Sequence, residues 1–235
     1  MDALFDGAVQ EIKRAYKSLG HTLGYRFLFS SRSTLSAGTK LMLVGVAPAG
    51  DRSYPSTVSH ENGNAFWRDV DLLHSKTYAI RVCRLFEDLA PALEEDRWQD
   101  LMDRTLTSNF CPFRSSTGLP EHNKGKTVDF CRKLWQRLRG ELRPRALICL
   151  GKHPYKEFRR VYEQLGFVGD GRQPIDIDTG KKEKFEFETF RHATHELTIF
   201  YVPHPSRGLR IFGNPEYSEG TQRFVGEVRA ALGGR

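Results

Sequence analysis

Four short segments of the chain carry hydrophobic residues in unbroken or nearly unbroken runs. They cover residues 40–46, 105–109, 145–150 and 196–202, and the second run is the most polar. Continuous apolar runs of this length are typical of strands that are covered on both faces of a sheet. The pattern therefore predicts four buried strands that pair mainly in parallel.

Between and around these strands, apolar residues recur with the spacing of an α-helix. The first such segment ends at Gly20, a residue type that commonly terminates helices. The predicted helices lie near residues 3–19, 64–74, 76–93, 95–103, 125–142, 153–165 and 218–232. Strands that alternate with helices favour an α/β protein built from βαβ units. We expect a three-layer α/β/α fold with a central, mainly parallel four-stranded sheet.

The chain has 235 residues, a length that suits one α/β domain with a large core. We expect a single domain over residues 1–235, in which residues 1–37 form an N-terminal helical extension. Residues 168–195 begin with a run rich in glycine and polar residues and continue into a charged stretch. This composition indicates an insertion with a short hairpin.

The composition argues against a membrane protein. No stretch approaches the roughly 18 apolar residues that a spanning helix needs, and the N-terminal residues lack the pattern of a signal peptide. We therefore expect a cytoplasmic protein that does not enter a membrane. The expected state is a monomer, although the residues leave the oligomeric state open.

The net charge of +7 favours an anionic partner without identifying one. Much of the positive charge lies in one stretch of the sequence. Its basic residues are Lys124, Lys126, Arg132, Lys133, Arg137, Arg139, Arg143 and Arg145, followed by Lys152, Lys156, Arg159 and Arg160. Two interpretations are open: solvent-exposed helix faces, or a surface that contacts phosphate groups.

Polar loops follow three of the predicted strands. Residues 45–50 (Gly-Val-Ala-Pro-Ala-Gly) follow the first strand, and residues 204–208 (His-Pro-Ser-Arg-Gly) follow the last. A third loop begins at Asn109. In open α/β sheets, ligands bind at the carboxyl ends of the strands. We therefore expect the loops to build one site from both ends of the chain.

These loops carry a resemblance to a known family. Residues 45–50, residues 109–112 (Asn-Phe-Cys-Pro) and residues 204–206 (His-Pro-Ser) occur in this order, each after a predicted strand. In this arrangement they resemble the uracil-DNA glycosylase superfamily over roughly residues 38–232. The first loop is similar to the Gly-Leu-Ala-Pro-Ala loop of the family 5 enzymes. The second is similar to the Asn-Tyr-Cys-Pro loop of the SMUG-type branch.

The resemblance implies a reaction and two central roles. Cleavage of an N-glycosidic bond leaves an anionic base and a sugar with oxocarbenium character, so the site needs donors at the base oxygens. The resemblance implies that His204 supports the departing base oxygen. It also implies that Asn109, whose amide offers a donor and an acceptor, reads one edge of a pyrimidine. The alternatives are a locally bonded histidine and a structural asparagine at a strand end.

The loop after the last strand is expected to contact DNA as well. The residues assigned to this contact are Ser206, Arg207, Leu209 and Arg210. Ser206 and the amides after it would hold a phosphate, or the serine caps a turn. Leu209 resembles the wedge that fills the space left by a flipped base, or it is an ordinary exposed leucine. Ile211 and Phe212 are possible substitutes for that wedge.

The residue that activates water is marked less strongly. Many superfamily members carry Asp or Asn at the third position of the first loop, where this chain has Ala47, as family 5 does. A later acidic residue is implicated in family 5, and its best match here is Glu61, with Asp51 as the rival. A carboxylate that acts through water contributes about 100- to 10,000-fold in rate. Glu61 can also be read as a helix N-cap partner.

The walls of the base pocket are predicted from the same segments. Ala47 and Phe110 are expected beside the base. The family places a stacking phenylalanine shortly before its acid, where this chain has Val58. Tyr54 or Phe66 is expected to take over the stacking. Otherwise the pocket is wider than a uracil pocket, and uracil is then a less suitable substrate.

No metal or other cofactor is expected. Families 4 and 5 hold an iron–sulfur cluster, which needs four thiolate ligands. Cys111 and Cys131 fall where the later two ligands would be, but the N-terminal Cys-x-x-Cys is absent. A zinc deaminase would show His-x-Glu and Pro-Cys-x-x-Cys, and neither occurs. Cys111 as a nucleophile lacks a histidine partner in the sequence.

The leading hypothesis is a monofunctional DNA glycosylase that flips uracil or a modified pyrimidine out of DNA and leaves an abasic site. An alternative is a glycosylase that acts on bulky hypermodified bases of phage DNA, as in defence. Another is a catalytically weak nucleic-acid-binding relative, which Ala47 favours and His204, Asn109 and Glu61 oppose. A nucleotide-binding enzyme is disfavoured because the glycine-rich phosphate motifs are missing. The base and the strand preference are left open.

Overall fold

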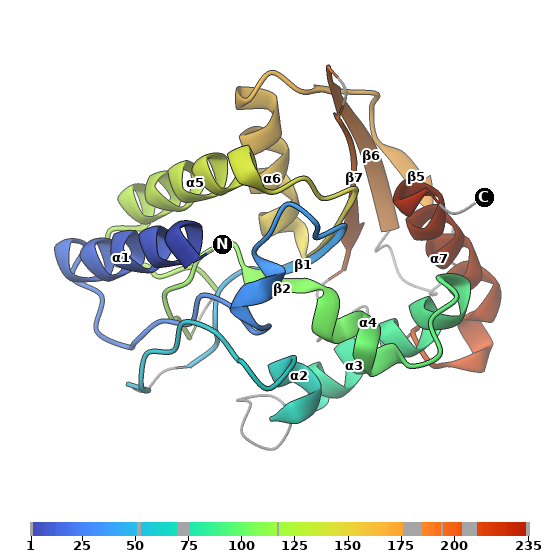
Figure 1. Cartoon of the computed structure of the whole chain (residues 1–235), viewed down its shortest axis with the longest axis horizontal. Coiled ribbons are helices and arrows are strands. Elements are labelled where there is room, and N and C mark those ends of the chain that lie inside the picture. The colour runs from blue at the N-terminus through green and yellow to red at the C-terminus, as the bar shows by residue number, and fades with distance from the viewer. Residues whose placement is uncertain are drawn as a thin grey trace.

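A mixed seven-stranded sheet forms the centre of the computed structural model (Figure 1). The structure describes residues 2–50, 53–69, 76–116, 118–175, 185–193, 195–203 and 211–233. The strands are β1 (Leu41–Gly45), β2 (Leu106–Asn109), β3 (Ala146–Leu150), β4 (Val168–Gly169), β5 (Gln173–Ile175), β6 (Phe185–His192) and β7 (His195–Val202). Their order is β2-β1-β3-β7-β6-β4, and β5 pairs with β6.

The four predicted strands form the parallel part of this sheet. β2, β1, β3 and β7 pair in parallel, and every residue of β1, β2 and β3 is buried. The prediction of a mainly parallel central sheet is confirmed. Burial on both faces explains why these strands show unbroken apolar runs rather than alternation.

The predicted insertion enlarges the sheet. β6 pairs with β7 in antiparallel fashion from Glu186 and Tyr201 to His192 and His195, and β4 and β5 pair with β6. The hairpin expected within residues 168–195 therefore has β7 as its second strand. The insertion adds three antiparallel strands beside the four parallel ones.

Helices cover both faces of the sheet, which gives the three predicted layers. The helices are α1 (Asp2–Ser18), α2 (Ala65–Arg68), α3 (Lys76–Ala92), α4 (Trp98–Arg104), α5 (Lys124–Glu141), α6 (Lys152–Gln164) and α7 (Ser218–Leu232). Apolar residues of α1, α5 and α6 pack into one core cluster, and those of α2, α3, α4 and α7 pack into another. Figure 1 shows the two groups on opposite sides of the strands.

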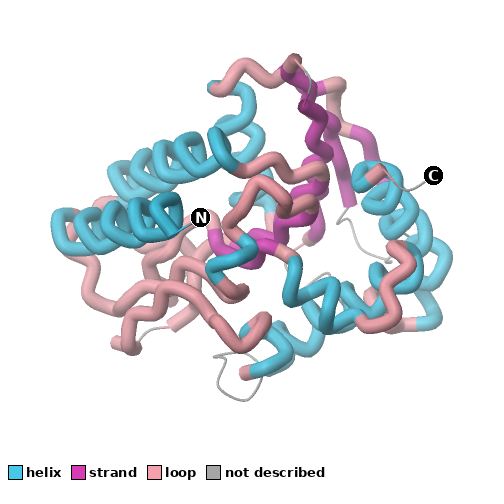
Figure 2. The backbone as a smooth tube through the Cα atoms, viewed as in Figure 1, coloured by secondary structure: helices cyan, strands magenta, loops and turns pink. Residues whose placement is uncertain are grey.

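Two irregular segments cover the outer edge of β2. Residues 24–30 run antiparallel to β2, with a bridge between Leu28 and Ser108, and residues 54–60 run alongside them, with a bridge between Arg26 and Thr57. Figure 2 shows that loops make up most of this side of the molecule. Covering an edge strand in this way satisfies backbone groups that would otherwise be free to pair with another chain.

The N-terminal helix packs onto the rest of the protein. Phe5 of α1 stacks on Phe27 with ring centroids 6.1 Å apart, and Glu11 pairs with Arg137 of α5 at 3.0 Å. Among the helices that the structure describes, none is long and apolar enough to cross a membrane.

Candidate active site

The first two predicted loops lie side by side at the carboxyl ends of β1 and β2. Gly45 and Asn109 are partners in the parallel register of these strands. The pairing continues into the loops, because the Phe110 amide donates to the Gly45 carbonyl at 2.8 Å and the Gly50 amide donates to the Ser115 carbonyl at 3.2 Å. This edge is where a parallel sheet places its ligands.

The side chain of Asn109 lies over the backbone of Gly45. A Cβ atom at Gly45 would overlap the Asn109 Oδ1 and come within 3.4 Å of the Tyr78 hydroxyl. Asn109 is 8% exposed, and its amide group makes no hydrogen bond to the part of the chain that the structure describes. The amide offers both a donor and an acceptor to a ligand.

Three aromatic side chains form a wall beside Asn109: those of Tyr78, Phe66 and Phe29. The Tyr78 hydroxyl adjoins Gly45, and burial raises its pKa well above the usual range for tyrosine, so it stays protonated. The Phe66 ring lies 5.6 Å from that of Tyr78 and stacks on Phe29 at 4.9 Å with nearly parallel planes. Phe66, predicted to stack on a base, is thus a buried part of this wall.

The position of Phe66 follows from the start of α2. Asn64 precedes the helix, and its side chain accepts a hydrogen bond from the Phe66 amide at 3.1 Å. The same side chain donates to the Thr107 hydroxyl of β2 at 2.7 Å. An N-cap residue that is also bonded to the sheet fixes both the start and the position of the helix.

Tyr54 lies on the outer side of the first loop. It is 41% exposed, and its ring carbons would lie 3.4–3.5 Å from a Cβ at Gly50. The Arg114 guanidinium lies over this ring at 4.9 Å and donates to the Ala49 carbonyl at 3.0 Å. Ala47, in the same loop, is half-buried and packs against the core.

Phe110 faces the core and not the pocket. Its ring is fully buried, 6.0 Å from the ring of Phe158 and 5.9 Å from that of His153, and its carbonyl accepts from the Trp135 indole at 2.9 Å. This placement does not favour the predicted contact with a base. We therefore do not propose that Phe110 contacts the base.

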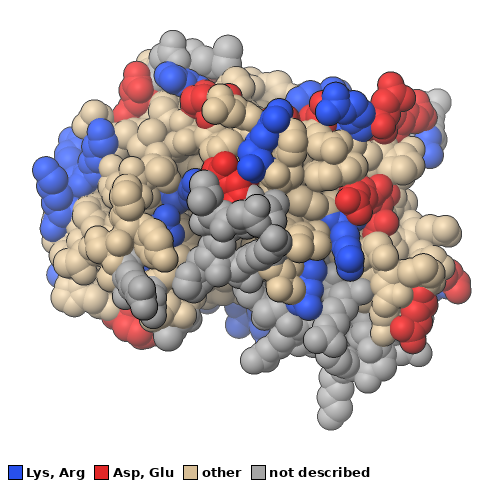
Figure 3. Space-filling model, turned by 90° about the horizontal axis from the view of Figure 1, so that it is seen from below, with Lys and Arg blue, Asp and Glu red and all other residues tan. Residues whose placement is uncertain are grey.

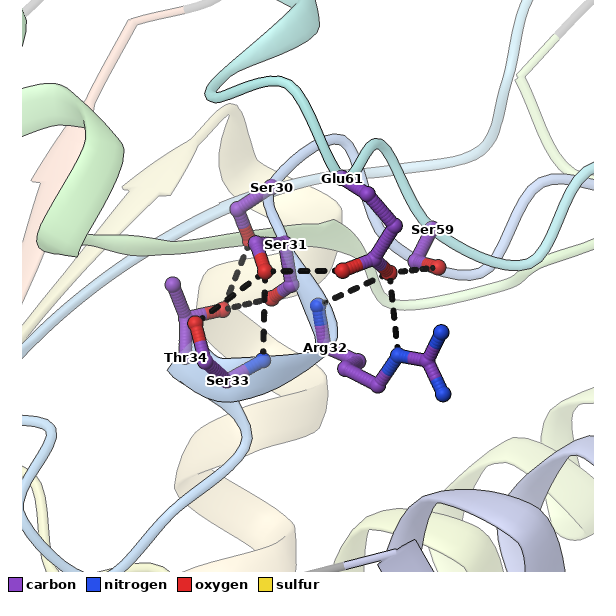
Figure 4. A network of polar contacts seen from close by, with 7 residues as sticks. All are labelled: Ser30, Ser31, Arg32, Ser33, Thr34, Ser59 and Glu61. Atoms are coloured by element: carbon purple, nitrogen blue, oxygen red, sulfur yellow. Dashed lines mark hydrogen bonds and ion pairs between the residues drawn. The ribbon is translucent and has the colours of Figure 1, made fainter.

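Glu61 is held in a network of side chains around the first 3₁₀ turn, Arg32–Thr34 (Figure 4). Its carboxylate accepts from the Ser31 hydroxyl at 3.0 Å, the Ser59 hydroxyl at 2.5 Å and the Arg32 amide at 3.3 Å. Burial alone would raise the pKa of Glu61, but these hydrogen bonds and the nearby Arg32 guanidinium together lower it. The structure thus favours the interpretation of Glu61 as a cap for a helical turn.

This network lies at the wrong end of β2 for catalysis at Asn109. Residues 24–30 run antiparallel to β2, with the Phe29 amide bonded to the Thr107 carbonyl. Ser31 therefore follows at the amino end of β2, whereas Asn109 is at its carboxyl end. The role of Glu61 as water activator is not supported by this position.

Several predicted site residues lie outside the described residues. They are Asp51, His204, Ser206, Arg207, Leu209 and Arg210. The strand that leads to His204 is described, and Val202 at its end pairs with Leu150 of β3. β3 in turn pairs with β1. Two strand spacings place the end of β7 about 10 Å from β1 along the same edge.

A hollow of about 700 Å³ lies at the opposite edge of the sheet. It is bordered by Thr39 and Lys40 before β1 and by Asp103 and Arg104 before β2, at the amino ends of the strands. Arg104 is paired with Glu95. We place the site at the carboxyl edge, because the Asn109 amide and the predicted loops are there.

A comparison with protein families identifies the family of the chain. The family model of the uracil DNA glycosylase superfamily matches residues 33–227, which include all seven strands of the sheet. The chain belongs to the uracil DNA glycosylase superfamily. Membership implies DNA glycosylase activity in general, with DNA as the molecule acted on. A comparison with curated proteins gave no match.

The cysteines of this superfamily member do not fit an iron–sulfur cluster. Cys83 packs in the core cluster of α3, on the opposite side of the sheet from Cys111, Cys131 and Cys149. Burial raises the pKa of Cys83 to about 12 and the pKa of Cys131 well above its usual range. Cluster ligands must be thiolates. Four thiolates therefore do not converge here.

Five of the twelve basic residues of the predicted segment form ion pairs in the described part of the chain. The pairs are Lys124–Glu121, Arg132–Glu157, Arg137–Glu11, Arg159–Glu188 and Arg160–Glu157. Figure 3 shows the molecule from below, with several basic side chains gathered at the left edge and acidic side chains elsewhere on this face. Because the other seven basic residues have no ion pair among the described residues, both interpretations of this segment, exposed helix faces and a surface that contacts phosphate groups, still apply.

Tyr78 and Arg114 were not identified from the sequence. Tyr78 lies in the first turn of α3, where its side chain reads as one more apolar position of a helix. Arg114 comes two residues after the Asn-Phe-Cys-Pro motif. This short separation could have indicated Arg114, because residues that follow a site motif closely in the sequence lie near the site.

Proposed function

We propose that this protein is a monofunctional DNA glycosylase that acts on uracil or a modified pyrimidine in DNA. The observation that carries the proposal is the nearly buried amide of Asn109 over Gly45, which has no partner among the described residues. An amide can donate to a base oxygen and accept from a ring N–H, which matches one edge of a pyrimidine. A base reaches such a recess after it has been flipped out of the stack.

His204 is proposed as the donor to the departing base. It directly follows Pro203, the buried residue after β7. As the glycosidic C–N bond breaks, its electron pair moves to the base, and negative charge builds up on the base oxygen. A donor at that oxygen contributes about 100- to 1000-fold in rate.

We assign water activation to Asp51. Asp51 directly follows Gly50, whose amide is bonded to Ser115 at this edge. Glu61 is engaged at the other end of β2. In the proposed reaction the carboxylate accepts a proton from water as the water oxygen bonds to the sugar carbon. The products are the free base and an abasic site.

The loop after β7 is proposed to hold the DNA. Ser206 and the amides that follow would bind a phosphate, Arg207 and Arg210 would add charge, and Leu209 would fill the gap in the stack. Phe66 and Tyr54 are the proposed aromatic contacts of the base and its surroundings. Ala47 is proposed to lie beside the base, where its small side chain leaves room for it.

Two alternatives remain as proposals with different support. A catalytically weak DNA-binding relative is favoured by the lack of any carboxylate in residues 45–50 and 109–115. The hypothesis of a bulky modified base depended partly on Val58. Val58 packs against a core cluster and its carbonyl accepts from the Leu28 amide at 3.1 Å, so its size says nothing about the width of the pocket.

The test is a panel of oligonucleotides that carry uracil or modified pyrimidines, single-stranded and duplex, together with phage DNAs. Abasic products are revealed by alkaline cleavage. We expect Asn109→Ala and Asp51→Asn to lower the single-turnover rate at least about 100-fold, and Glu61→Gln to stay near the wild-type rate. Asp69→Asn, a carboxylate paired with His60 at 2.9 Å, is the matched control.

The outcomes separate the proposals. If Glu61→Gln abolishes cleavage and Asp51→Asn does not, the assignment of the acid is wrong. If all the variants cleave at the wild-type rate, the site is elsewhere. Binding without cleavage of any substrate would favour the weak relative.

A further inference from the structure

Two arginines project from the same face of the segments beside the first loop. Tyr25 and Phe113 face each other in an antiparallel bridge, and both are buried in a core cluster. Side chains alternate along extended segments. Arg26 and Arg114, each next to a bridge residue, therefore point to the opposite face.

Each guanidinium is positioned by a ring and by one polar contact. Arg26 lies over the Phe29 ring at 4.8 Å, and its Nε donates to the Thr57 hydroxyl at 3.1 Å. Phe29 is the residue that stacks on Phe66. Arg26 thus adjoins the aromatic wall that leads to Asn109.

Arg114 is held by its contacts with the Tyr54 ring and the Ala49 carbonyl. Its Nε is buried and has no hydrogen-bond partner among the described residues. The two arginines therefore lie near each other, Arg26 beside Phe29 and Arg114 beside the exposed Tyr54.

Neither guanidinium has a carboxylate within 4 Å in the described part of the chain. Burial and then the neighbouring Arg114 lower the pKa of Arg26, against an opposing effect of the Asp69 carboxylate, and burial lowers the pKa of Arg114. Arg132 of α5 and Arg159 of α6 each contact a buried glutamate, whereas Arg139 of α5 donates to the Leu142 carbonyl and has no carboxylate within 4 Å in the described part of the chain. Two like charges that are partly buried and close together are unfavourable without an anion.

We propose that Arg26 and Arg114 form a subsite for a phosphate group of the DNA backbone next to the flipped nucleotide. A guanidinium presents a planar fork of donors that matches phosphate oxygens, and two of them can share one phosphodiester. The subsite lies beside the first loop, apart from the loop after β7. It rests on the proposed function, because the phosphate is that of a DNA strand whose base enters the Asn109 pocket.

The experiment measures binding and does not require cleavage. An oligonucleotide with a tetrahydrofuran abasic analogue is titrated with wild-type protein, Arg26→Ala, Arg114→Ala and Arg114→Lys over a range of salt concentrations. Neutral methylphosphonates replace single phosphates near the analogue. Arg223→Ala is the control, because Arg223 of α7 is exposed and already paired with Glu219.

For each phosphate that a variant no longer binds, we expect the slope of log affinity against log salt to fall by about 0.9 on duplex DNA, or about 0.7 on single strands. One methylphosphonate position should weaken the wild-type protein and have no further effect on the alanine variants. Arg114→Lys should keep most of the slope, because the charge is retained, but bind less tightly. Thermal unfolding of each variant checks that the fold is intact.

The subsite is overturned if folded alanine variants keep the wild-type slope, if they stay sensitive to every methylphosphonate, or if no DNA binds. Cleavage of a substrate with these results would leave the glycosylase proposal standing without the subsite. A reduced slope in a protein that cleaves none of the panel would support the subsite and contradict the glycosylase proposal.

Discussion

Gly45 shows how the absence of one side chain shapes the site. The space that a Cβ would take is filled by the Asn109 amide and the Tyr78 hydroxyl. We expect Gly45→Ala to displace the amide and lower the single-turnover rate about as much as Asn109→Ala. The double variant should be no slower than either single one, because both changes remove the same interaction with the base.

Unfolding in urea provides the control for this comparison. Overpacking costs typically about 1–3 kcal/mol, so Gly45→Ala should still fold. A Gly45→Ala enzyme with the wild-type rate would show that the amide does not read the base from this position.

Single residues also show which parts of the site could be predicted from the sequence and which could not. Asn109 was identified because a motif after an apolar run fixes it at the end of a strand. Glu61 was matched through the resemblance of residues 59–66 to a family 5 motif, but residues 54–60 lead the chain toward the amino end of β2. This path depends on tertiary contacts such as the bond from the Ser108 hydroxyl to the Phe27 carbonyl at 2.6 Å. No local pattern in the sequence encodes it.

The elements also divide into those that the sequence pattern predicts and those that it does not. β1, β3 and β7 could be predicted because burial on both faces leaves an unbroken apolar signal. β6 was harder to place, because its alternating Phe-Glu pattern reads as a half-exposed hairpin strand. The register that joins it to β7 depends on pairs such as Thr189 with Thr198, whose hydroxyls are 3.1 Å apart.

The attachment of α6 to β6 can be tested through one ion pair. Glu188 of β6 is nearly buried and accepts from Arg159 of α6 at 2.5 and 3.2 Å. We expect Glu188→Ala to lower the free energy of unfolding by about 2 kcal/mol, less than the roughly 3–5 kcal/mol of a fully buried pair, because Arg159 keeps some solvent contact. Urea denaturation measures the change.

A double variant distinguishes the pair from simple packing. Arg159→Met with Glu188→Leu removes both charges and keeps the volume, so it should be more stable than Glu188→Ala alone. If the double variant is less stable than Glu188→Ala, the destabilisation of Glu188→Ala comes from lost packing and not from the unpaired charge of Arg159.

At the scale of the whole molecule, net charge is a poor guide to where DNA lies. The chain has a net charge of +7, yet in its densest basic segment five of the twelve basic residues are paired with acids from their own and neighbouring elements. Three partly buried arginines have no ion pair with a described acid; Arg139 lies in that segment, whereas Arg26 and Arg114 lie outside it. A binding surface is indicated better by unpaired charge than by total charge, since a neutralised helix face attracts phosphate weakly.

The pH dependence of stability is a second property of the whole molecule. His153 lies in the first turn of α6 and His195 begins β7, and burial lowers the pKa of both rings below 6.5. As the pH falls, the unfolded chain binds protons at these histidines before the folded protein does. Their contribution to stability is therefore complete above about pH 6.5 and is lost as the pH falls toward the folded pKa values.

We expect the free energy of unfolding to decrease from pH 7 to pH 5 by less than about 1.4 kcal/mol per pH unit for each ring, because both rings keep some solvent contact. A variant with His153→Gln and His195→Gln should show a flatter dependence than the wild type, and the remaining slope should include His21, whose pKa burial also lowers. Urea denaturation at each pH gives the curves. If the double variant loses stability as steeply as the wild type, other groups set the acid sensitivity and these two rings are not its source.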